Sequence, residues 1–335
     1  DGKIEPEGRR SSPEGLDCRI LTGGLLTAHK GVSFPATNLT APALTERDME
    51  CIVAGPKAGG DYFGLSFVRD AHDIERARDF LASHGAEADG AMVARGDLGV
   101  ELPPEDVPVQ QRHIIAAAGR YKIPVITATQ MLESMIDSPR PTRAEASDVA
   151  NAVWELADAL MLSGETAIGK YPVEAVAMMD RIIRRAEAAT AEFERDVMTP
   201  SETDDHSLVV ALAARRIVES DVNMKAVVCF TNSGYTALLL SKVHPNAPIY
   251  AISPHEVVTR RLALARGVIP LRSDLVGSSE ELLRSVDHLL TAGRHVAEGE
   301  EVVVVASLPV SAHGTTNFLK LHRIGESAGY AGHKA

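Results

Sequence analysis

A glycine and an aspartate follow a short apolar run, at the kind of position that catalytic groups occupy in parallel α/β proteins. The run Ala91–Ala94 has the length and composition of a buried strand, and Arg95, Gly96 and Asp97 come directly after it. Active sites in such proteins are built at the carboxyl ends of the strands. Asp97 offers carboxylate oxygens to a hard cation, and Gly96 lets backbone N–H groups approach an anion. The pattern predicts a cation and an anionic substrate, although taken alone it is more typical of a turn with a capping aspartate.

Two further strand ends carry polar groups. The predicted strand Val125–Ala128 leads into Thr129, and the predicted strand Ala159–Leu162 leads into Ser163 and Glu165. Three successive strand ends with hydroxyl, carboxylate and glycine residues have the layout of an active site built from neighbouring βα loops. We therefore expect the three turns to face one site.

The segments around these strand ends resemble pyruvate kinase. The matching segments are 92–101, 127–135, 140–151 and 161–166, with shorter matches at 30–32, 42–45 and 66–69. The resemblance runs with gaps from Asp1 to about Ile324. It implies transfer of the phosphoryl group of phosphoenolpyruvate to ADP, giving pyruvate and ATP in glycolysis. It also implies a cytoplasmic, allosteric homotetramer that uses Mg²⁺ or Mn²⁺, with K⁺ as a further candidate ion.

The resemblance assigns a role to each residue of the site. Asp97 is the metal ligand, and the N–H groups of Gly96 and Asp97 hold the substrate carboxylate together with Thr129. Thr129 also lies near the enol carbon, and Ser163 joins a proton relay through water. Arg95 has two interpretations, because it either reaches a phosphate or braces the loop through a salt bridge. Glu165 is as consistent with a structural role as with a catalytic one.

The nucleotide is assigned to three residues, which are Lys30, Lys170 and Tyr171. Lys170 stands two residues beyond the position at which the family has a basic residue, here occupied by Ile168. The alternative for Tyr171 is simple packing beside Pro172.

Parts of the family pattern are absent from the sequence. Between Glu87 and Ala88 the family has a strand with a lysine, which stabilises the phosphoryl group in transfer, and a glutamate, which is a second metal ligand. The barrel strands before the small β domain are absent too. Four strands cannot close an eight-stranded barrel, which typically needs roughly 250 residues. Because deleted strands would leave long unpaired edges, we expect the sequence to be part of a longer protein rather than a natural deletion product.

The chain divides into three predicted regions. Residues 1–33 are the remnant of a small β domain, or lid; residues 34–195 form a partial barrel; and residues 206–335 form a regulatory domain. The predicted fold class is α/β: a partial (β/α)₈ TIM barrel, the β remnant with a turn at Gly23 and Gly24, and a C-terminal α/β open sheet. The predicted strands are 19–21, 62–67, 91–94, 125–128, 159–162, 226–230, 249–252, 268–271 and 302–305. The predicted helices are 73–81, one beginning near Pro104, 148–155, 172–188, 208–218, 236–243, 257–265 and 280–290.

The turn from Thr231 to Thr236 lies between a predicted strand and a predicted helix. Hydroxyls, a glycine and a helix N-terminus suit a phosphate, although serine and threonine are also common helix caps. The resemblance favours an effector-phosphate pocket, which is formed by Thr231, Asn232, Ser233, Gly234 and Thr236. The loop 314–317 is expected to complete it. Because Asn232 and Tyr235 carry no charge, we expect a monophosphate rather than a bisphosphate.

Composition excludes several classes of protein. The net charge of −12 leaves no basic surface for nucleic acid, and no apolar run is long enough to cross a membrane.

Cys18, Cys51 and Cys229 are odd in number and widely spaced. We interpret them as reduced, mostly buried thiols of a cytosolic protein, and not as a disulfide framework or zinc site.

Four charged residues cluster after the second strand end. Arg140, Arg143, Glu145 and Asp148 suit either a solvated face or a subunit contact. The resemblance favours the subunit contact.

Two other functions remain open. One is a metal-dependent barrel lyase acting on enolpyruvate-type substrates, which residues 206–335 disfavour because such an enzyme needs no effector domain. The other is a non-catalytic family member that senses phosphorylated metabolites. The missing lysine and glutamate support that sensor only if they are truly deleted.

Overall fold

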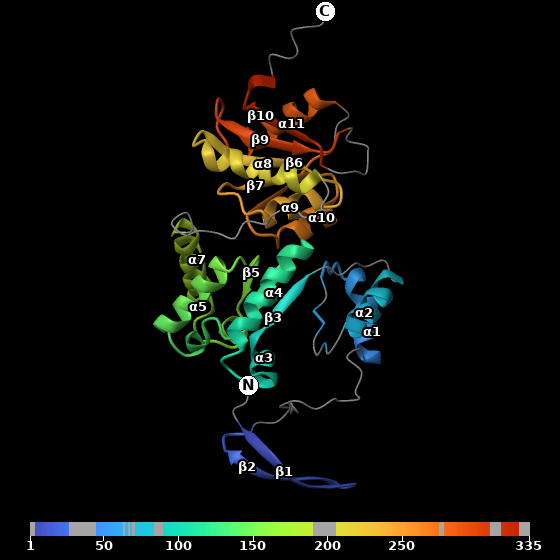
Figure 1. The fold of residues 1–335 in the computed structure, drawn as a ribbon, viewed down its shortest axis with the longest axis vertical. Helices are drawn as coiled ribbons and strands as arrows, with labels where there is room; N and C mark the ends of the chain where they lie inside the picture. Colours follow the sequence, from blue (N-terminus) through green and yellow to red (C-terminus); the bar gives the residue numbers. More distant parts are fainter. Residues whose placement is uncertain are drawn as a thin grey trace, which may run out of the picture.

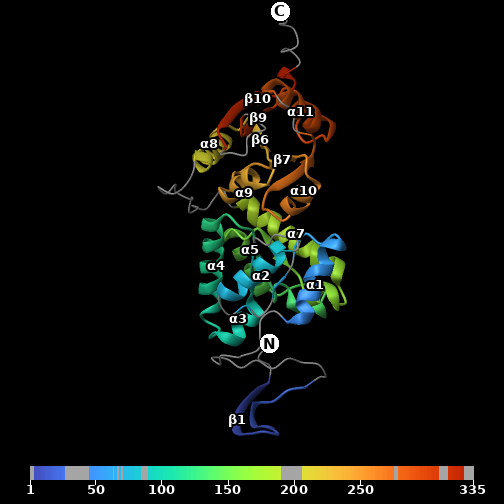
Figure 2. The same cartoon turned by 90° about the vertical axis from the view of Figure 1, so that its right-hand side faces the viewer.

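The computed structural model describes residues 4–26, 45–62, 64–65, 68, 71–83, 90–189, 206–274, 278–308 and 316–327. These residues form a two-stranded, a three-stranded and a five-stranded sheet. The two-stranded sheet lies at one end of the molecule, the five-stranded sheet at the other, and the three-stranded sheet between them (Figures 1 and 2). This mixed α/β architecture, with sheets that do not close, agrees with the predicted partial barrel.

The two-stranded sheet is an antiparallel hairpin of β1 (Glu5–Ser12) and β2 (Gly15–Thr22). The predicted strand 19–21 lies inside β2. The turn predicted at Gly23 and Gly24 is wrong, because residues 23–26 lie in no turn; the chain reverses instead at Pro13 and Glu14. Every residue of both strands is exposed, so neither face of the hairpin packs on another described element.

The central region is a parallel sheet in the order β3-β4-β5, which matches three predicted strands. Its strands are β3 (Ala91–Ala94), β4 (Val125–Ala128) and β5 (Ala159–Met161). Its helices are α1 (Glu46–Lys57), α2 (Ala71–Ser83), α3 (Arg95–Glu101), α4 (Val107–Tyr121), the 3₁₀ helix η1 (Glu133–Ile136), α5 (Arg143–Trp154), α6 (Gly164–Ala167) and α7 (Pro172–Ala189). The strand predicted at 62–67 is wrong for residues 62, 64 and 65, which lie in no strand; residues 63, 66 and 67 lie outside the described residues.

Two apolar clusters hold this sheet and the turns at its carboxyl edge. Val93 and Val125 are fully buried against α4. The residues that follow β4 are buried as well: Met131, Leu132 and Met135 pack against α5 and α7. Because the loop after β4 is anchored by burial, its polar groups have defined positions.

The C-terminal region is a five-stranded sheet in the order β10-β9-β6-β7-β8. Its strands are β6 (Met224–Phe230), β7 (Ile249–Ser253), β8 (Val268–Arg272), β9 (Glu301–Ala306) and β10 (Phe318–Arg323). Its helices are α8 (His206–Ser220), α9 (Tyr235–Lys242), α10 (Glu256–Leu262) and α11 (Ser279–Ala292). Val303 and Val305 face the cluster with α8 and α9, whereas Val302 and Val304 face α11. Burial on both faces explains the unbroken apolar runs of the parallel strands.

β10 was not predicted, and it alone runs antiparallel to its neighbour in this sheet. Its sequence, Phe-Leu-Lys-Leu-His-Arg, has no clean alternation, and its burial does not follow polarity, because Leu321 is exposed whereas His322 is buried. The other four strands and the four helices of this region agree with the prediction.

Ion pairs join the two larger regions. Lys242, at the end of α9, pairs with Asp158, which precedes β5, and both side chains are buried. Asp158 also accepts a hydrogen bond from the backbone N–H of Val125 at 2.8 Å. Arg260 of α10 pairs with Asp61 at 2.8 Å. These contacts fix the C-terminal region against the amino-terminal edge of the three-stranded sheet.

β10 is tied to α11 through the carboxylate of Asp287. His322 Nε2 lies 2.8 Å from Asp287 Oδ1, the backbone N–H of Gly325 donates to the same oxygen at 2.9 Å, and the hydroxyl of Ser327 donates to Oδ2. Partial burial raises the pKa of Asp287, but the hydrogen bonds from Ser327, Gly325 and His322 outweigh it and hold the pKa below its usual value.

Replacing Asp287 by asparagine is expected to lower the free energy of unfolding of this region by about 2 kcal/mol at neutral pH. The reason is that the hydrogen-bond donors of Ser327, Gly325 and His322 would then meet a neutral amide in place of a carboxylate. Since the folded-state pKa is lowered, the carboxylate's contribution is complete above the unfolded pKa of about 4 and is lost as the pH falls through the folded-state pKa. Urea unfolding of both proteins at pH 7 and pH 3 measures this. Equal midpoints at pH 7 would contradict the prediction.

The three cysteines are free, as predicted, but they are not mostly buried. Cys18 and Cys51 are exposed, and only Cys229 of β6 is buried. Burial raises the pKa of the Cys229 thiol to about 12, so this thiol stays protonated and unreactive. No helix in the described ranges has the length and apolar character to cross a membrane.

Candidate active site at the carboxyl edge of the parallel sheet

The ends of β3 and β4 meet through a hydrogen bond between two of the predicted site residues. The backbone N–H of Gly96 donates to Thr129 Oγ1 at 2.8 Å. The strands are parallel and paired in register from Ala91 to Ala94, so their carboxyl ends lie at the same edge. A short helix that was not predicted, α3, starts at Arg95 directly after β3, and the helix predicted to begin near Pro104 is α4, which starts at Val107. Gly96 and Thr129 therefore lie next to each other at one edge of the sheet.

Thr129 and Gln130 have an unusual backbone conformation. Their φ angles are 68° and 55°, in the left-handed region that residues with a side chain seldom adopt. For a β-branched residue such as Thr129 this conformation costs about 1–3 kcal/mol. Strain of this kind persists only where surrounding contacts enforce it, and it concentrates at functional sites.

Arg95 contributes to holding Thr129 in this conformation. Its side chain is 9% exposed, and Nε and Nη2 donate to the carbonyl oxygen of Thr129 at 3.1 and 2.6 Å. Nη1 donates to Asp148 Oδ2 at 2.5 Å. Of the two interpretations of Arg95, this geometry favours the brace over contact with a phosphate.

Asp97 is exposed on the first turn of α3, and no hydrogen bond or ion pair of its side chain is found among the described residues. Protein-bound magnesium keeps several waters and takes one or two carboxylates, while substrate oxygens supply the rest. A free carboxylate at a strand end fits one of those positions. The described residues contain no group of three His, Cys, Asp or Glu side chains able to hold an ion by themselves. A metal at Asp97 therefore depends on substrate and water oxygens.

The end of β5 adds a buried carboxylate and a buried hydroxyl. Glu165 is 2% exposed and accepts hydrogen bonds from the backbone N–H groups of Leu132 at 3.0 Å and Ser163 at 2.8 Å. These bonds favour the structural interpretation of Glu165. The hydroxyls of Ser163 and of Thr127 on β4 are buried and have no hydrogen-bond partner among the described residues. Such a group is available to a ligand or an ordered water.

The nucleotide residues are only partly described. Lys30 lies outside the described residues. Lys170 is exposed and forms an ion pair with Asp137 at 2.8 Å, and this hydrogen bond and the charge of Asp137 raise the pKa of Lys170. Tyr171 is half-buried directly before α7. Lys170 and Tyr171 are consecutive residues between α6, which follows Ser163, and α7.

Only some of the residues predicted for the effector site, in the turn before α9, are exposed. Gly234, with φ 94°, caps the helix in a conformation that glycine tolerates, and its N–H donates to Thr231 Oγ1 at 2.9 Å. Thr231 and Thr236 are buried, and Thr236 Oγ1 lies 2.9 Å from Thr316 Oγ1. Ser233 is exposed. The expectation that all three hydroxyls face a ligand therefore does not fit the geometry, which leaves Ser233, with the half-buried Asn232, at the surface.

Residues 314–317 were expected to complete that pocket. Thr316 contacts Thr236 as described, and its N–H donates to Ser207 Oγ at 2.8 Å. Gly314 and Thr315 lie outside the described residues.

Sequence reasoning missed the braces around the loop after β4. Glu145 accepts hydrogen bonds from the backbone N–H of Ser134 at 2.7 Å and from its hydroxyl at 2.5 Å. Glu145 also forms a capping box with Thr142, so α5 begins at Arg143 and not at residue 148. The pattern Thr-x-x-Glu at 142–145 carried that signal. Two of the four charged residues proposed as a subunit contact, Glu145 and Asp148, thus have partners within the chain.

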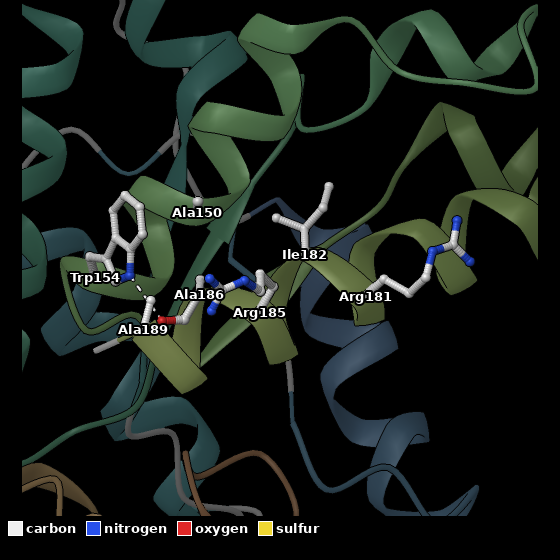
Figure 3. Close-up of a pocket in the computed structure, with 7 residues that line it drawn as sticks. All are labelled: Ala150, Trp154, Arg181, Ile182, Arg185, Ala186 and Ala189. Atoms are coloured by element: carbon white, nitrogen blue, oxygen red, sulfur yellow. Dashed lines mark hydrogen bonds between the residues drawn. The ribbon is translucent and has the colours of Figure 1, made fainter. Parts of the chain in front are cut away.

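A pocket of about 500 Å³ lies elsewhere, between α5 and α7 (Figure 3). It is lined by Ala150, Trp154, Arg181, Ile182, Arg185, Ala186 and Ala189. The indole N–H of Trp154 donates to the carbonyl oxygen of Ala186 at 3.0 Å and joins the two helices. None of the predicted site residues lines this pocket.

Two family models match the chain. The model described as "Pyruvate kinase, barrel domain" matches residues 1–88 and 86–176, and the model described as "Pyruvate kinase, alpha/beta domain" matches residues 209–322. The barrel match is thus in two pieces that meet at 86–88, where the sequence resemblance lacks a strand.

Curated relatives agree with the models. The chain is 40% identical to "Pyruvate kinase 2" of Synechocystis sp., with 96% of this chain and 58% of the relative covered. It is 40% identical to "Pyruvate kinase" of Geobacillus stearothermophilus, with 92% and 56% covered. It is 37% identical to "Pyruvate kinase" of Clostridium perfringens, with 97% and 74% covered. The chain therefore spans less than two thirds of the length of the first two of these relatives.

Proposed function

The chain belongs to the pyruvate kinase family, and we propose on that basis that it transfers the phosphoryl group of phosphoenolpyruvate to ADP, giving pyruvate and ATP. The observation that carries the proposal is the contact between Gly96 N–H and Thr129 Oγ1, beside the exposed carboxylate of Asp97. This edge of the sheet offers donors for an anionic substrate and one oxygen ligand for a cation.

Positioning and electrostatics are the chemistry that such a site supplies to phosphoryl transfer. The N–H groups of Gly96 and Asp97 and the hydroxyl of Thr129 bind and orient the substrate carboxylate. Asp97 would hold Mg²⁺ or Mn²⁺, which would supply positive charge to stabilise the phosphoryl group during transfer; K⁺ is a further candidate ion. After transfer, the enolate is protonated at carbon by water near Thr129, and the unpartnered hydroxyl of Ser163 is placed to take part in that relay.

The nucleotide site is proposed at Lys30, Lys170 and Tyr171. Lys170 must release Asp137 to meet a phosphate, which is a small cost for an exposed ion pair. The hairpin of β1 and β2 is proposed as part of a lid, and its exposed Leu16, Ile20 and Leu21 are consistent with a surface that closes on another part of the protein. A cytoplasmic homotetramer, with Arg140 and Arg143 at a subunit contact, completes the proposal.

One observation favours a second candidate, a non-catalytic member of the family that senses phosphorylated metabolites. The described residues contain no group of three or more His, Cys, Asp or Glu side chains that could hold a metal ion. Pyruvate formation from phosphoenolpyruvate and ADP, measured by coupling to lactate dehydrogenase, separates the two. Turnover that depends on ADP and Mg²⁺ supports the kinase, and binding of phosphorylated ligands without turnover supports the sensor. Pyruvate formed without ADP would mean that water accepts the phosphoryl group, which is phosphatase activity and contradicts the kinase.

An effector phosphate is proposed at the turn before α9, near Ser233 and the helix N-terminus. Ser233→Asp places a carboxylate where the phosphate binds, so we expect it to abolish activation by repulsion. The measurement is the ratio of activated to unactivated rates with hexose monophosphate, pentose monophosphate and AMP. Ser279→Asp, at the start of α11, adds the same charge to another helix and is the control. Undiminished activation of the Ser233 variant would show that the turn is only a helix cap.

A further inference from the structure

The loop that carries Thr129 is held by side chains from three other elements. Arg95 of α3 donates two hydrogen bonds to the carbonyl oxygen of Thr129, at 3.1 and 2.6 Å. Glu165 of α6 and Glu145 of α5 accept hydrogen bonds from backbone N–H groups later in the loop, at 3.0 and 2.7 Å. Of these three side chains, Arg95 alone contacts Thr129 itself, whose hydroxyl also accepts a hydrogen bond from the N–H of Gly96.

Asp148 of α5 forms an ion pair with Arg95. Its Oδ2 accepts from Arg95 Nη1 at 2.5 Å, and the side chain of Arg95 is 9% exposed whereas that of Asp148 is 36% exposed. A guanidinium so nearly buried is costly without a carboxylate partner. The planar fork of arginine then spans both acceptors at once, with Nη1 on the carboxylate and Nε and Nη2 on the carbonyl.

The held conformation is one that Thr129 would not adopt freely. With φ at 68° its Cβ is crowded, and the next residue is left-handed too. In this conformation the carbonyl oxygen of Thr129 accepts a hydrogen bond from Arg95, and its Oγ1 accepts one from the N–H of Gly96 at 2.8 Å. Loss of the carbonyl contact leaves the hydrogen bond from Gly96 to Oγ1 as the remaining contact of these two that opposes the strain.

We propose that Asp148 is a positioning residue which, acting through Arg95, holds Thr129 in the left-handed conformation that places its hydroxyl beside Gly96. The kinetic part of this inference rests on the proposed function, in which Thr129 contacts the substrate. The conformational part rests only on the contacts of Arg95.

Asp148→Asn keeps the shape of the side chain and removes the charge that anchors Arg95. We expect kcat for pyruvate formation to fall about tenfold with a smaller change in KM for phosphoenolpyruvate, because reactive groups are displaced rather than lost. Asp148→Glu, which restores the carboxylate, is expected to recover most of the rate. The control is Asp180→Asn, which removes the carboxylate of an exposed pair with Arg184 on α7 and is expected to leave kcat within twofold.

A double-mutant cycle with Thr129→Val separates positioning from general destabilisation. If Asp148 acts through the hydroxyl of Thr129, Asp148→Asn has less than about a twofold effect once that hydroxyl is gone. Equal effects in both backgrounds overturn the proposal.

Hydrogen exchange of the peptide 129–136, followed by mass spectrometry, reads the conformation without using activity. We expect exchange in Asp148→Asn to be about tenfold faster in this peptide than in the wild-type chain, with the peptide of α7 unchanged. Unchanged exchange in 129–136 overturns the proposal, whether or not the protein forms pyruvate. If no pyruvate forms at all, the proposed function fails while this measurement still decides the role of Asp148.

Discussion

Asp97→Asn is expected to reduce turnover by roughly a hundredfold or more, because charge stabilisation by a metal is worth several kcal/mol in such reactions. The substitution keeps the size and shape of the side chain and removes the negative charge that a hard cation needs. Because Asp97 is exposed and has no protein partner among the described residues, the fold should be unchanged. We expect the concentration of Mg²⁺ or Mn²⁺ needed for half-maximal activity to rise together with the loss of rate.

The measurement is steady-state pyruvate formation across a Mg²⁺ titration, with thermal melting as the check on folding. Asp106→Asn is the matched control, since Asp106 is also exposed, stands before α4 and makes no capping hydrogen bond. A titration of the Asp97 variant that overlays the wild-type curve would refute the metal assignment.

Thr129→Val is expected to lower kcat by about tenfold to a hundredfold while KM for phosphoenolpyruvate changes less, because an interaction made chiefly in the transition state affects the rate. Valine is β-branched like threonine, so the crowding at a φ of 68° is the same and only the hydroxyl is lost. The N–H of Gly96 loses its acceptor as well. The variant therefore isolates the chemistry of one oxygen atom.

Thr129→Ser is the companion variant, because it keeps the hydroxyl and removes only a methyl group. Initial rates across phosphoenolpyruvate concentrations should show kcat largely restored in the serine variant. If KM alone moves in the valine variant, Thr129 binds the carboxylate and has no part in protonating the enolate.

The elements of this protein were largely predictable because their signals are local. Short apolar runs gave β3, β4, β5 and the parallel strands of the C-terminal sheet, and apolar residues at helical spacing gave α2 and α8. Parallel pairing then requires the carboxyl ends to meet, so the sequence predicts Gly96, Asp97 and Thr129 at one edge of the sheet. The strand predicted at 62–67 failed among its described residues, since an apolar run alone does not show whether a neighbouring strand is present to pair with it.

Helix starts were predicted less well where the capping signal was overlooked. α5 begins at Arg143 because Thr142 and Glu145 form a capping box, a pattern that the sequence displays openly. β10 was missed for another reason. An edge strand that is only half buried has a weak hydrophobic pattern, and its pairing with β9 depends on the rest of the sheet.

The sequence by itself determined the family, the α/β class and the residues that gather at the candidate site. The tertiary structure decided how those side chains are used. It joined Arg95 to Thr129 and Asp148, which lie 34 and 53 positions away in the chain, and it turned Thr231 and Thr236 of the effector turn inward. It also exposed Cys18 and Cys51. The physical reason is that strands and helices follow from the periodicity of neighbouring residues, whereas the partner of a long or buried polar side chain depends on packing between segments far apart in the sequence.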